Sequence, residues 1–344
     1  MGNLPFRESV CFNDVLLVPQ MSSIISRADI NITQSLYNHG PLNLPIISSP
    51  MDTVTETSMA IAMHQSGGLG IVHRYNSINE QSDMVTEVAE EGISVGVGAA
   101  IGVTGDFVER ATTLRDAGAN LLCLDVAHGH HVNVRYALEV LRKTLGDGIH
   151  IMAGNVATLE GFNDLADWGA DSIRVGIGGG SICSTRIQTG HGVPTLQSII
   201  DCSRTDRDAS IIADGGIKTS GDAVKALAAG ADFVMLGSML SGTNETPGAY
   251  FRKDGRAYKK YRGMASKEAQ MDWRGYLSSR EGVSTLVELK GSVIQVLEDI
   301  ESGIRSGFSY SGASSIEELQ VKARFIKQTS NGSAESESHI LHVK

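Results

Sequence analysis

The chain has 344 residues, 41% of them hydrophobic, so it can bury a large core, and it is longer than most single domains other than barrels of alternating strands and helices. A formal charge of −10 without a long basic run argues against a nucleic-acid partner, and no apolar run approaches the ~18 residues that span a bilayer, so we expect no membrane association. Four widely spaced cysteines without C-x-x-C pairs predict a reducing, cytoplasmic location.

Eight short apolar runs predict strands along the chain. They span residues 44–49, 68–72, 93–100, 120–126, 150–156, 172–177, 210–213 and 232–240. Helical patterns separate most of them, with apolar residues three or four positions apart, as at Val134, Leu138, Leu141 and Leu145. Such alternation predicts parallel strands joined by crossover helices.

Three predicted helix ends share one pattern, Gly-Ala followed by Asn or Asp, at residues 118–120, 169–171 and 230–232. Glycine is common where a helix closes, so the next strand begins directly after each. This repeat favours an α/β fold of the (β/α)8 TIM-barrel type over an open doubly wound sheet. We expect a single catalytic domain over residues 1–344.

In such barrels the functional residues lie at the C-terminal ends of the strands. The residues that follow the predicted strands are polar, reactive or glycine, which makes them site candidates. They include Ser49, Met51, His73, Arg74, Asp125, Ala127, Asn155, Asp214, Gly215, Gly216, Gly237 and Ser238.

The segment 173–192 follows the sixth predicted strand and carries the most distinctive chemistry. Its glycines, including Gly176, Gly178 and Gly180, let backbone groups approach a ligand or ion, and Ser181, Cys183 and Thr185 come next. A thiol in this place suggests a nucleophile on a phosphate- and ion-binding loop. The alternatives are a buried structural cysteine and a dinucleotide fingerprint, but the flanking residues argue against the first and the glycine spacing against the second.

The C-terminal third of the chain has fewer apolar patterns. Residues 242–282 are rich in charge and glycine, which predicts a mobile active-site flap that excludes water, followed by a closing helix over 293–304. The polar C-terminal tail, 329–344, is expected to be disordered unless an ion or a neighbouring subunit orders it.

Several loop residues have two interpretations. His128, His130 and His131 could be metal ligands, but the sequence shows no supporting site, and solvated histidines on a cofactor-side loop are favoured. Asp125, Asp214 and Glu281 could be capping or solvated carboxylates, the usual fate of acids in loops.

Six segments, in order, resemble signature segments of the IMP dehydrogenase/GMP reductase family over nearly the whole chain. They are F-N-D-V-L-L-V-P (12–19), P-I-I-S-S-P-M-D-T-V-T-E (45–56), A-G-N-V-A-T (153–158), G-S-I-C-S-T-R (180–186), I-A-D-G-G-I (212–217) and V-M-L-G-S (234–238). The resemblance implies a (β/α)8 barrel, usually a homotetramer, whose loop cysteine attacks C2 of a purine mononucleotide. It also implies NADPH or NAD as cofactor and a monovalent cation, namely potassium.

The resemblance also implies roles for individual residues. Cys183 would be the nucleophile, with Thr185 and Glu281 as its catalytic partners. Substrate binding would involve Ser49, Met51, Ser181, Asp214, Gly215, Gly216, Gly237, Ser238, Tyr261, Gly263 and Met264. The cofactor side would involve Asp125, Ala127, Asn155 and Gly176, and the backbone carbonyls of Gly178, Gly180 and Cys183 would hold the cation.

Two departures from the family pattern bear on which direction of the reaction we expect. The nucleotide-sensing insertion that dehydrogenases carry after the second strand is absent, and the flap has Arg274-Gly275-Tyr276 in place of an adjacent Arg-Tyr pair. We therefore expect a GMP reductase. The alternatives are an IMP dehydrogenase, which segments such as 98–100 resemble, and a catalytically weak nucleotide-binding barrel that acts as a sensor or assembly partner.

Overall fold

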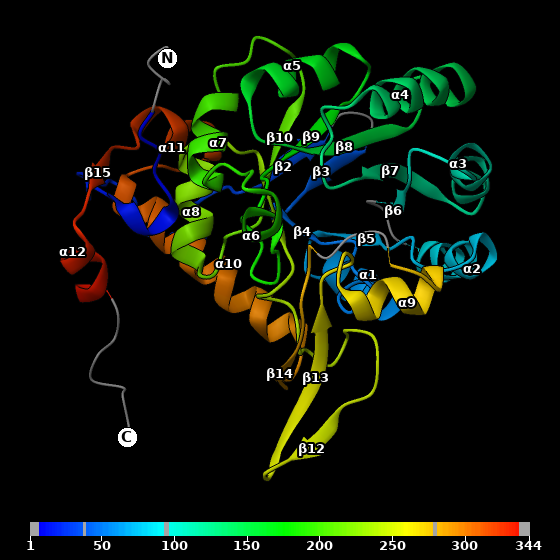
Figure 1. The fold of residues 1–344 in the computed structure, drawn as a ribbon. Coiled ribbons are helices and arrows are strands. Elements are labelled where there is room, and N and C mark those ends of the chain that lie inside the picture. The colour runs from blue at the N-terminus through cyan, green and yellow to red at the C-terminus, as the bar shows by residue number, and fades with distance from the viewer. Residues whose placement is uncertain (1–6, 37–38, 93–95, 278–280, 337–344) are drawn as a thin grey trace, which may run out of the picture.

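A closed barrel of eight parallel strands forms the centre of the computed structural model, which describes residues 7–36, 39–92, 96–277 and 281–336 (Figure 1). The strands are β4 (Ile46–Ser48), β5 (Leu69–Val72), β6 (Val97–Ile101), β7 (Ala119–Asp125), β8 (His150–Val156), β9 (Ser172–Val175), β10 (Ser210–Asp214) and β11 (Phe233–Leu236). Each strand comes from one of the eight predicted runs, although residues 93–95 of the third run lie outside the described residues. The predicted (β/α)8 barrel is confirmed.

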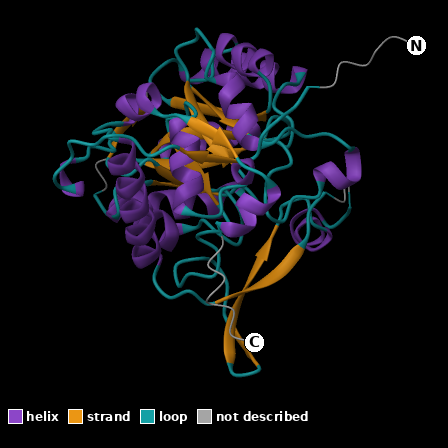
Figure 2. Ribbon diagram, turned by 90° about the vertical axis from the view of Figure 1, so that its left-hand side faces the viewer, coloured by secondary structure: helices purple, strands orange, loops and turns teal. Residues whose placement is uncertain are grey.

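Helices surround the barrel (Figure 2). They are α1 (Thr57–Gln65), α2 (Ile78–Glu90), α3 (Phe107–Asp116), α4 (Val132–Leu145), α5 (Leu159–Asp167), α6 (Thr185–Thr189), α7 (Thr195–Cys202) and α8 (Ser220–Ala228). Of the four apolar residues that predicted α4, Val134, Leu138 and Leu141 are fully buried and Leu145 is partly buried. The apolar stripe of α4 is therefore part of the core cluster that it shares with the strands.

The Gly-Ala-Asp/Asn repeat joins helices to strands, as expected. Gly118, Gly169 and Gly230 have φ angles of 110°, 107° and 112°, which residues other than glycine rarely adopt. Asp171 and Asp232 then each accept a hydrogen bond of 2.7 Å through Oδ2, from the backbone N–H of the strand residues Ile151 and Ile211. The carboxylate thus ties the start of one strand to its neighbour.

A hairpin near the N-terminus, which the sequence did not predict, contributes to the barrel interior. Its strands are β2 (Gln34–Leu36) and β3 (Gly40–Leu42). Leu36 and Leu42 pack in one cluster with inward-facing strand residues such as Ile47, Leu69 and Phe233. Two strands of three residues each are too short to show a period, so periodicity could not predict the hairpin.

The predicted flap is folded more regularly than its composition suggested. It contains β12 (Phe251–Lys253), β13 (Arg256–Arg262) and α9 (Lys267–Arg274). The two strands form an antiparallel sheet with β14 (Ser284–Glu288), which begins just after the predicted flap, and this sheet projects from the barrel (Figure 1). In β13, Lys259 is 5% exposed because its ammonium group donates to the carbonyls of Asn244 and Thr246. A charged residue that is buried by such hydrogen bonds interrupts the alternation of apolar and polar residues by which a strand is recognised in the sequence.

The described part of the C-terminal segment packs beside residues 12–17. After the long helix α10 (Val293–Ser311), which extends the predicted closing helix, come α11 (Ile316–Lys322), β15 (Phe325–Lys327) and α12 (Ser330–Glu335). Strand β15 pairs with β1 (Val15–Leu17), which lies between two single-turn helices, η1 (Phe12–Asp14) and η2 (Arg27–Asp29).

The start of the C-terminal tail is helical, contrary to the expectation of disorder. The Thr329 hydroxyl accepts a hydrogen bond from the Gly332 N–H and so caps α12, and the preceding Gln328 side chain donates to the Asn13 carbonyl. The remainder of the tail, 337–344, lies outside the described residues. Among the helices that are described, none is long and apolar enough to cross a membrane.

Candidate active site

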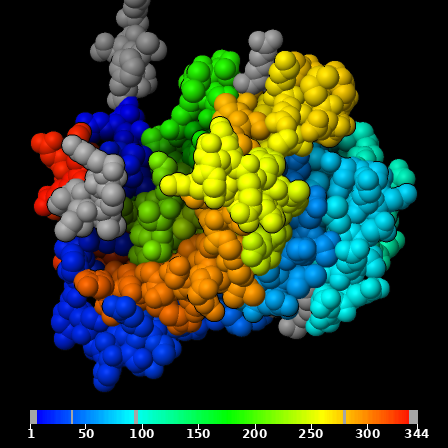
Figure 3. Space-filling view, turned by 90° about the horizontal axis from the view of Figure 1, so that it is seen from below, coloured from blue at the N-terminus to red at the C-terminus, as the bar shows by residue number. Residues whose placement is uncertain are grey.

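The residues predicted to form the site meet in one cleft of about 480 Å³ at the C-terminal ends of the barrel strands. Asp125 ends β7, Asp214 ends β10 and Gly176 directly follows β9. All residues proposed for catalysis, substrate, cofactor and cation line this cleft, and the flap contributes part of its wall. In the space-filling view, the yellow residues of the flap cross the middle of the face seen from below (Figure 3).

Three side chains form a line of hydrogen bonds in the cleft. The Cys183 thiol lies 3.1 Å from Thr185 Oγ1, and Thr185 Oγ1 lies 3.0 Å from Glu281 Oε2. The thiol is exposed, whereas Thr185 and Glu281 are half-buried. A proton can therefore pass from sulfur to a carboxylate through one hydroxyl group.

Backbone pairing places Glu281 beside the cysteine loop. The Ser184 N–H donates to the Glu281 carbonyl (3.0 Å), and the Val283 N–H donates to the Ile182 carbonyl (3.1 Å). Gly282 lies between them, opposite Cys183, where an added Cβ would come within 2.8 Å of the Ser266 backbone nitrogen. A flap residue distant in sequence is thus held next to the nucleophile by main-chain contacts.

The glycine loops after β9 and β10 pack directly on each other. A Cβ at Gly176 would lie 1.9 Å from the Asp214 carbonyl oxygen, and one at Gly179 would lie 2.4 Å from Thr195 Oγ1. Thr195 is 4% exposed, and its hydroxyl has no hydrogen-bond partner among the described residues. The close approach of neighbouring atoms at both positions, together with a φ of 148° at Gly176, explains these glycines.

A second group of residues converges around Gly237, after β11. A Cβ at Gly237 would lie 3.1 Å from Tyr261 Oη, 3.3 Å from Met51 Sδ and 3.4 Å from Ser49 Oγ. Tyr261 is 4% exposed, and burial raises the pKa of its hydroxyl although a hydrogen bond with Ser181 opposes the shift. The hydroxyl is therefore a neutral donor at physiological pH.

Arg174 is a site residue that our sequence reasoning missed. Its guanidinium, 8% exposed, donates to Asp125 Oδ1 (2.6 Å) and Asp214 Oδ2 (2.8 Å), and the Asn155 amide also donates to Asp214 Oδ2 (2.7 Å). Burial would raise the pKa of Asp125, but the charges of Arg174 and Arg74 outweigh it and lower the pKa. The feature of the sequence that could have identified Arg174 is that it is a single charged residue within the apolar run of β9.

Aromatic and basic residues form the wall of the cleft beside Asp125. The Tyr75 hydroxyl lies 3.2 Å from Asp125 Oδ2, and the Tyr75 ring meets the edge of the Trp273 ring at a centroid distance of 5.2 Å. The Arg74 guanidinium lies 5.1 Å from the Tyr75 centroid. Trp273, on α9, was also missed; a tryptophan within a polar segment was the signal.

Of the remaining candidates, Arg274 lines the cleft, whereas Tyr276 and the three loop histidines are not among its described lining residues. Tyr276 is 62% exposed and is not among the described residues that line the cleft, whereas Arg274 packs on Trp273 at 4.1 Å. His130 pairs with Asp164 (2.7 Å), and His131 caps α4 through a hydrogen bond from the Asn133 N–H.

A family model, curated relatives and a solved structure all relate this chain to the same family. A family model described as the IMP dehydrogenase / GMP reductase domain matches residues 9–339. An inosine-5′-monophosphate dehydrogenase of Nitrosopumilus maritimus is 34% identical, covering 98% of this chain and 99% of the relative, and a GMP reductase of Leishmania major is 33% identical, covering 98% of each. A GMP reductase structure from Trypanosoma brucei, in complex with guanosine 5′-monophosphate, has a TM-score of 0.91, 32% identity, and coverage of 97% of this chain and 98% of that one.

Proposed function

Since this chain belongs to the IMP dehydrogenase/GMP reductase family, oxidoreductases that act on purine nucleotides with NAD(P)(H), we propose that it is a GMP reductase that converts GMP to IMP and ammonia. The observation that carries the proposal is the hydrogen-bonded line from Cys183 through Thr185 to Glu281. It supplies both a nucleophile and a proton relay, and residues 263–282 contain no adjacent Arg-Tyr pair that could activate water instead.

In the proposed mechanism, Cys183 passes its proton through the Thr185 hydroxyl to Glu281, and its sulfur forms a bond to C2 of the purine while the electron pair of the C2–N3 double bond moves to N3. The C2–N bond then breaks, and the amino group takes a proton relayed by Thr185 from Glu281 and leaves as ammonia. The sulfur remains bonded to C2, which divides a difficult displacement into two steps. When bound, the reduced dinucleotide supplies the hydride that C2 requires. The C–S bond finally breaks and frees IMP.

The other parts of the cleft have matching proposed roles. The loops at Gly216, Gly237 and Ser238, with Tyr261 and Ser181, would hold the 5′-phosphate, because backbone N–H groups and neutral hydroxyls suit an anion. Asp214 would bind the ribose hydroxyls. Asp125, Ala127 and Asn155 would face the nicotinamide, beside the aromatic wall of Tyr75 and Trp273.

Carbonyl oxygens of Gly178, Gly180 and Cys183 fit a monovalent cation, because such ions prefer hard oxygen ligands. The Gly180 carbonyl already accepts a hydrogen bond from the Cys183 N–H (3.1 Å), so it would offer its second lone pair. We also propose NADPH as the reductant, a homotetramer and a cytoplasmic location, which four free cysteines support.

IMP dehydrogenase activity is the alternative, because relatives of both names match at similar identity. The missing insertion does not separate the two: the alignments with the Nitrosopumilus dehydrogenase and the Leishmania reductase extend over 474 and 486 residues, so both relatives have segments that this chain of 344 lacks. The Thr185–Glu281 pair could also take a proton from water.

The test is to supply the purified protein with GMP and NADPH, and separately with IMP and NAD, and to follow the absorbance of the reduced cofactor. We expect rapid oxidation of NADPH with GMP and slow or no reduction of NAD with IMP. Faster oxidation of IMP would overturn the proposal. Absence of both reactions, together with an unreactive Cys183 in thiol labelling, would favour a binding protein.

A further inference from the structure

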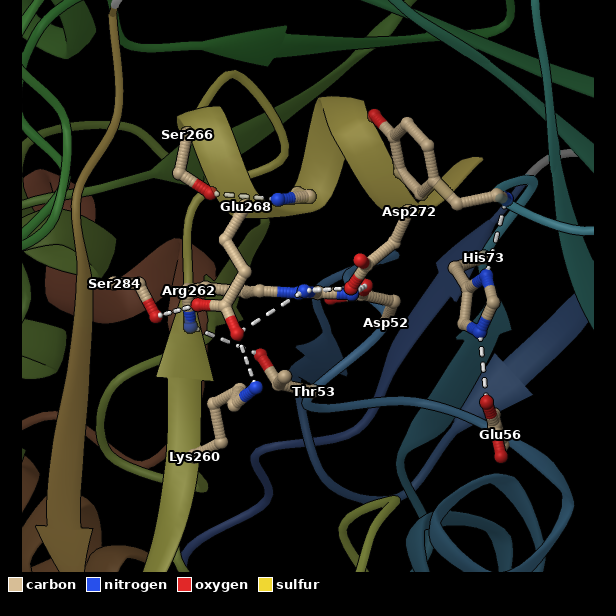
Figure 4. A network of polar contacts seen from close by, with 12 residues as sticks. Asp52, Thr53, Glu56, His73, Lys260, Arg262, Ser266, Glu268, Asp272 and Ser284 are labelled. Carbon is tan, nitrogen blue, oxygen red and sulfur yellow. Dashed lines mark hydrogen bonds and ion pairs between the residues drawn. The ribbon is translucent and has the colours of Figure 1, made fainter. Parts of the chain in front are cut away.

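An ion-pair network joins the flap to the barrel on the side of β13 that faces away from the cleft. Along β13, Tyr261 points toward Gly237 in the cleft, and because successive side chains of a strand alternate, Arg262 points to the opposite side. Its side chain is only 11% exposed. Figure 4 shows it reaching from the strand into a group of oxygen atoms from the barrel and from α9.

The first arm of the network ends on the loop after β4. Arg262 Nε lies 3.0 Å from Asp52 Oδ2, Nη2 lies 2.5 Å from the same oxygen, and the Arg262 backbone N–H donates to Thr53 Oγ1 (3.2 Å). Asp52, whose side chain is 12% exposed, directly follows Met51 in the chain. The contact thus joins two neighbours of the cleft, since Met51 and Tyr261 both line it.

The second arm ends on α9. Arg262 Nη1 lies 2.5 Å from Asp272 Oδ2 and 3.8 Å from Glu268 Oε1. Glu268 in turn pairs with Lys260 and accepts a hydrogen bond from the Ser284 hydroxyl (2.7 Å). Asp272 directly precedes Trp273, the residue that brings α9 against Tyr75 at the cofactor wall.

The electrostatics keep this arginine charged. Burial would lower its pKa, but the hydrogen bonds and charges of Asp52 and Asp272 outweigh burial and raise the pKa. A buried charge that loses one partner is costly, so the two carboxylates and the guanidinium hold one another in place.

The geometry points to Arg262 as a positioning residue with two separable effects. Through Asp52 it fixes the distance between the β4 loop and β13, and so the shape of the purine nucleotide site. Through Asp272 it seats α9, and so the wall at which the cofactor docks. This inference rests on the proposed function only in that the cleft binds a purine nucleotide and a dinucleotide; it does not depend on the direction of the reaction.

The experiment compares Asp52→Asn, Asp272→Asn, Arg262→Met and Arg262→Lys with the wild type. Arg256→Met is the matched control, because Arg256 lies on the same strand but pairs with Glu288 at 3.5 Å, both largely exposed. Nucleotide affinity is measured by calorimetry with GMP and with IMP, cofactor KM and kcat by steady-state kinetics, and opening of α9 by hydrogen exchange.

We expect Asp52→Asn to weaken nucleotide binding by about tenfold or more while cofactor KM changes less than about twofold. Asp272→Asn should raise the cofactor KM by about tenfold or more while nucleotide affinity changes less than about twofold, and hydrogen exchange in α9 should become faster. Arg262→Met should show both effects, and Arg262→Lys should recover part of each. The control should match the wild type.

The inference is overturned if Asp52→Asn and Asp272→Asn change the same parameter, or if neither differs from Arg256→Met. If Arg262→Met does not fold, Asp272→Asn still decides the α9 arm, because Asp272 is 58% exposed and tolerates a polar replacement. If the protein oxidises IMP rather than reducing GMP, the same two patterns are measured with IMP and NAD, so failure of the proposed function is distinct from failure of the inference.

Discussion

Cys183, Thr185 and Glu281 illustrate how a few residues decide the chemistry of the cleft. Cys183 lies at the end of the loop after β9 and Thr185 begins α6, whereas Glu281 comes from the flap. The line of hydrogen bonds from Cys183 Sγ through Thr185 Oγ1 to Glu281 Oε2 therefore forms only when the two segments pair. A change that keeps the shape of the Glu281 side chain should therefore affect proton transfer more than binding, because Glu281 is the last group of the relay.

Glu281→Gln should lower kcat by a factor of about 10² to 10⁴, since an amide keeps the shape but cannot relay the proton. The dissociation constant for GMP should change little. Glu288→Gln serves as the control, because Glu288 is an exposed carboxylate on β14. An equal loss of kcat in both variants, or an unchanged kcat in Glu281→Gln, would show that Glu281 is not part of the relay.

His39 provides a pH test at a site far from catalysis. It is 7% exposed in the hairpin that fills the barrel, and burial, with smaller effects from His150 and His64, lowers its pKa to about 4 from 6.5. The folded protein therefore stays unprotonated at His39 where the unfolded chain is already charged. Its contribution to stability is present above about pH 6.5 and is lost as pH falls toward 4.

Chemical unfolding at several pH values should show this loss as about 2 kcal/mol between about pH 7.5 and about pH 5. In His39→Gln that part of the pH dependence should disappear, whereas His191→Gln, at an exposed position, should retain it. An identical pH dependence in His39→Gln and the wild type would contradict the assignment.

At the scale of elements, the packing of the glycine loops after β9 and β10 fixes the form of the cleft. Gly179 is held by the Thr195 side chain at the start of α7 rather than by an unusual φ angle, because its φ is not in the left-handed region. The loop, the helix and the strand end therefore form one packed unit.

Gly179→Ala should cost about 1 to 3 kcal/mol of stability by overpacking and weaken GMP binding by at least about tenfold, because the added Cβ would lie 2.4 Å from Thr195 Oγ1. Adding Thr195→Ala should recover most of the loss. Gly148→Ala is the control, since nothing lies within 4 Å of a Cβ there. Thermal unfolding and calorimetry measure both effects, and the absence of recovery in the double variant would refute the packing argument.

At the scale of the whole molecule, the sequence predicted the barrel because strand runs and glycine-closed helices repeat with a regular period. It predicted the cleft because polar residues follow those strands. Arg174 and Trp273 were not predicted, because Arg174 is a charged residue within the apolar strand β9 and Trp273 is an aromatic residue within the polar helix α9. The strands within the flap and the hairpin at Leu36 and Leu42 could not be predicted from periodicity, because hydrogen-bonded charged residues such as Lys259 and the shortness of the strands conceal the period.

The barrel, the cysteine loop and the flap together are proposed to remove ammonia from GMP. The most direct measurement is to count ammonia and IMP formed from GMP against the NADPH oxidised by the purified protein. We predict one ammonia and one IMP for each NADPH oxidised. Formation of no ammonia from GMP, with production of XMP from IMP and NAD, would contradict the account.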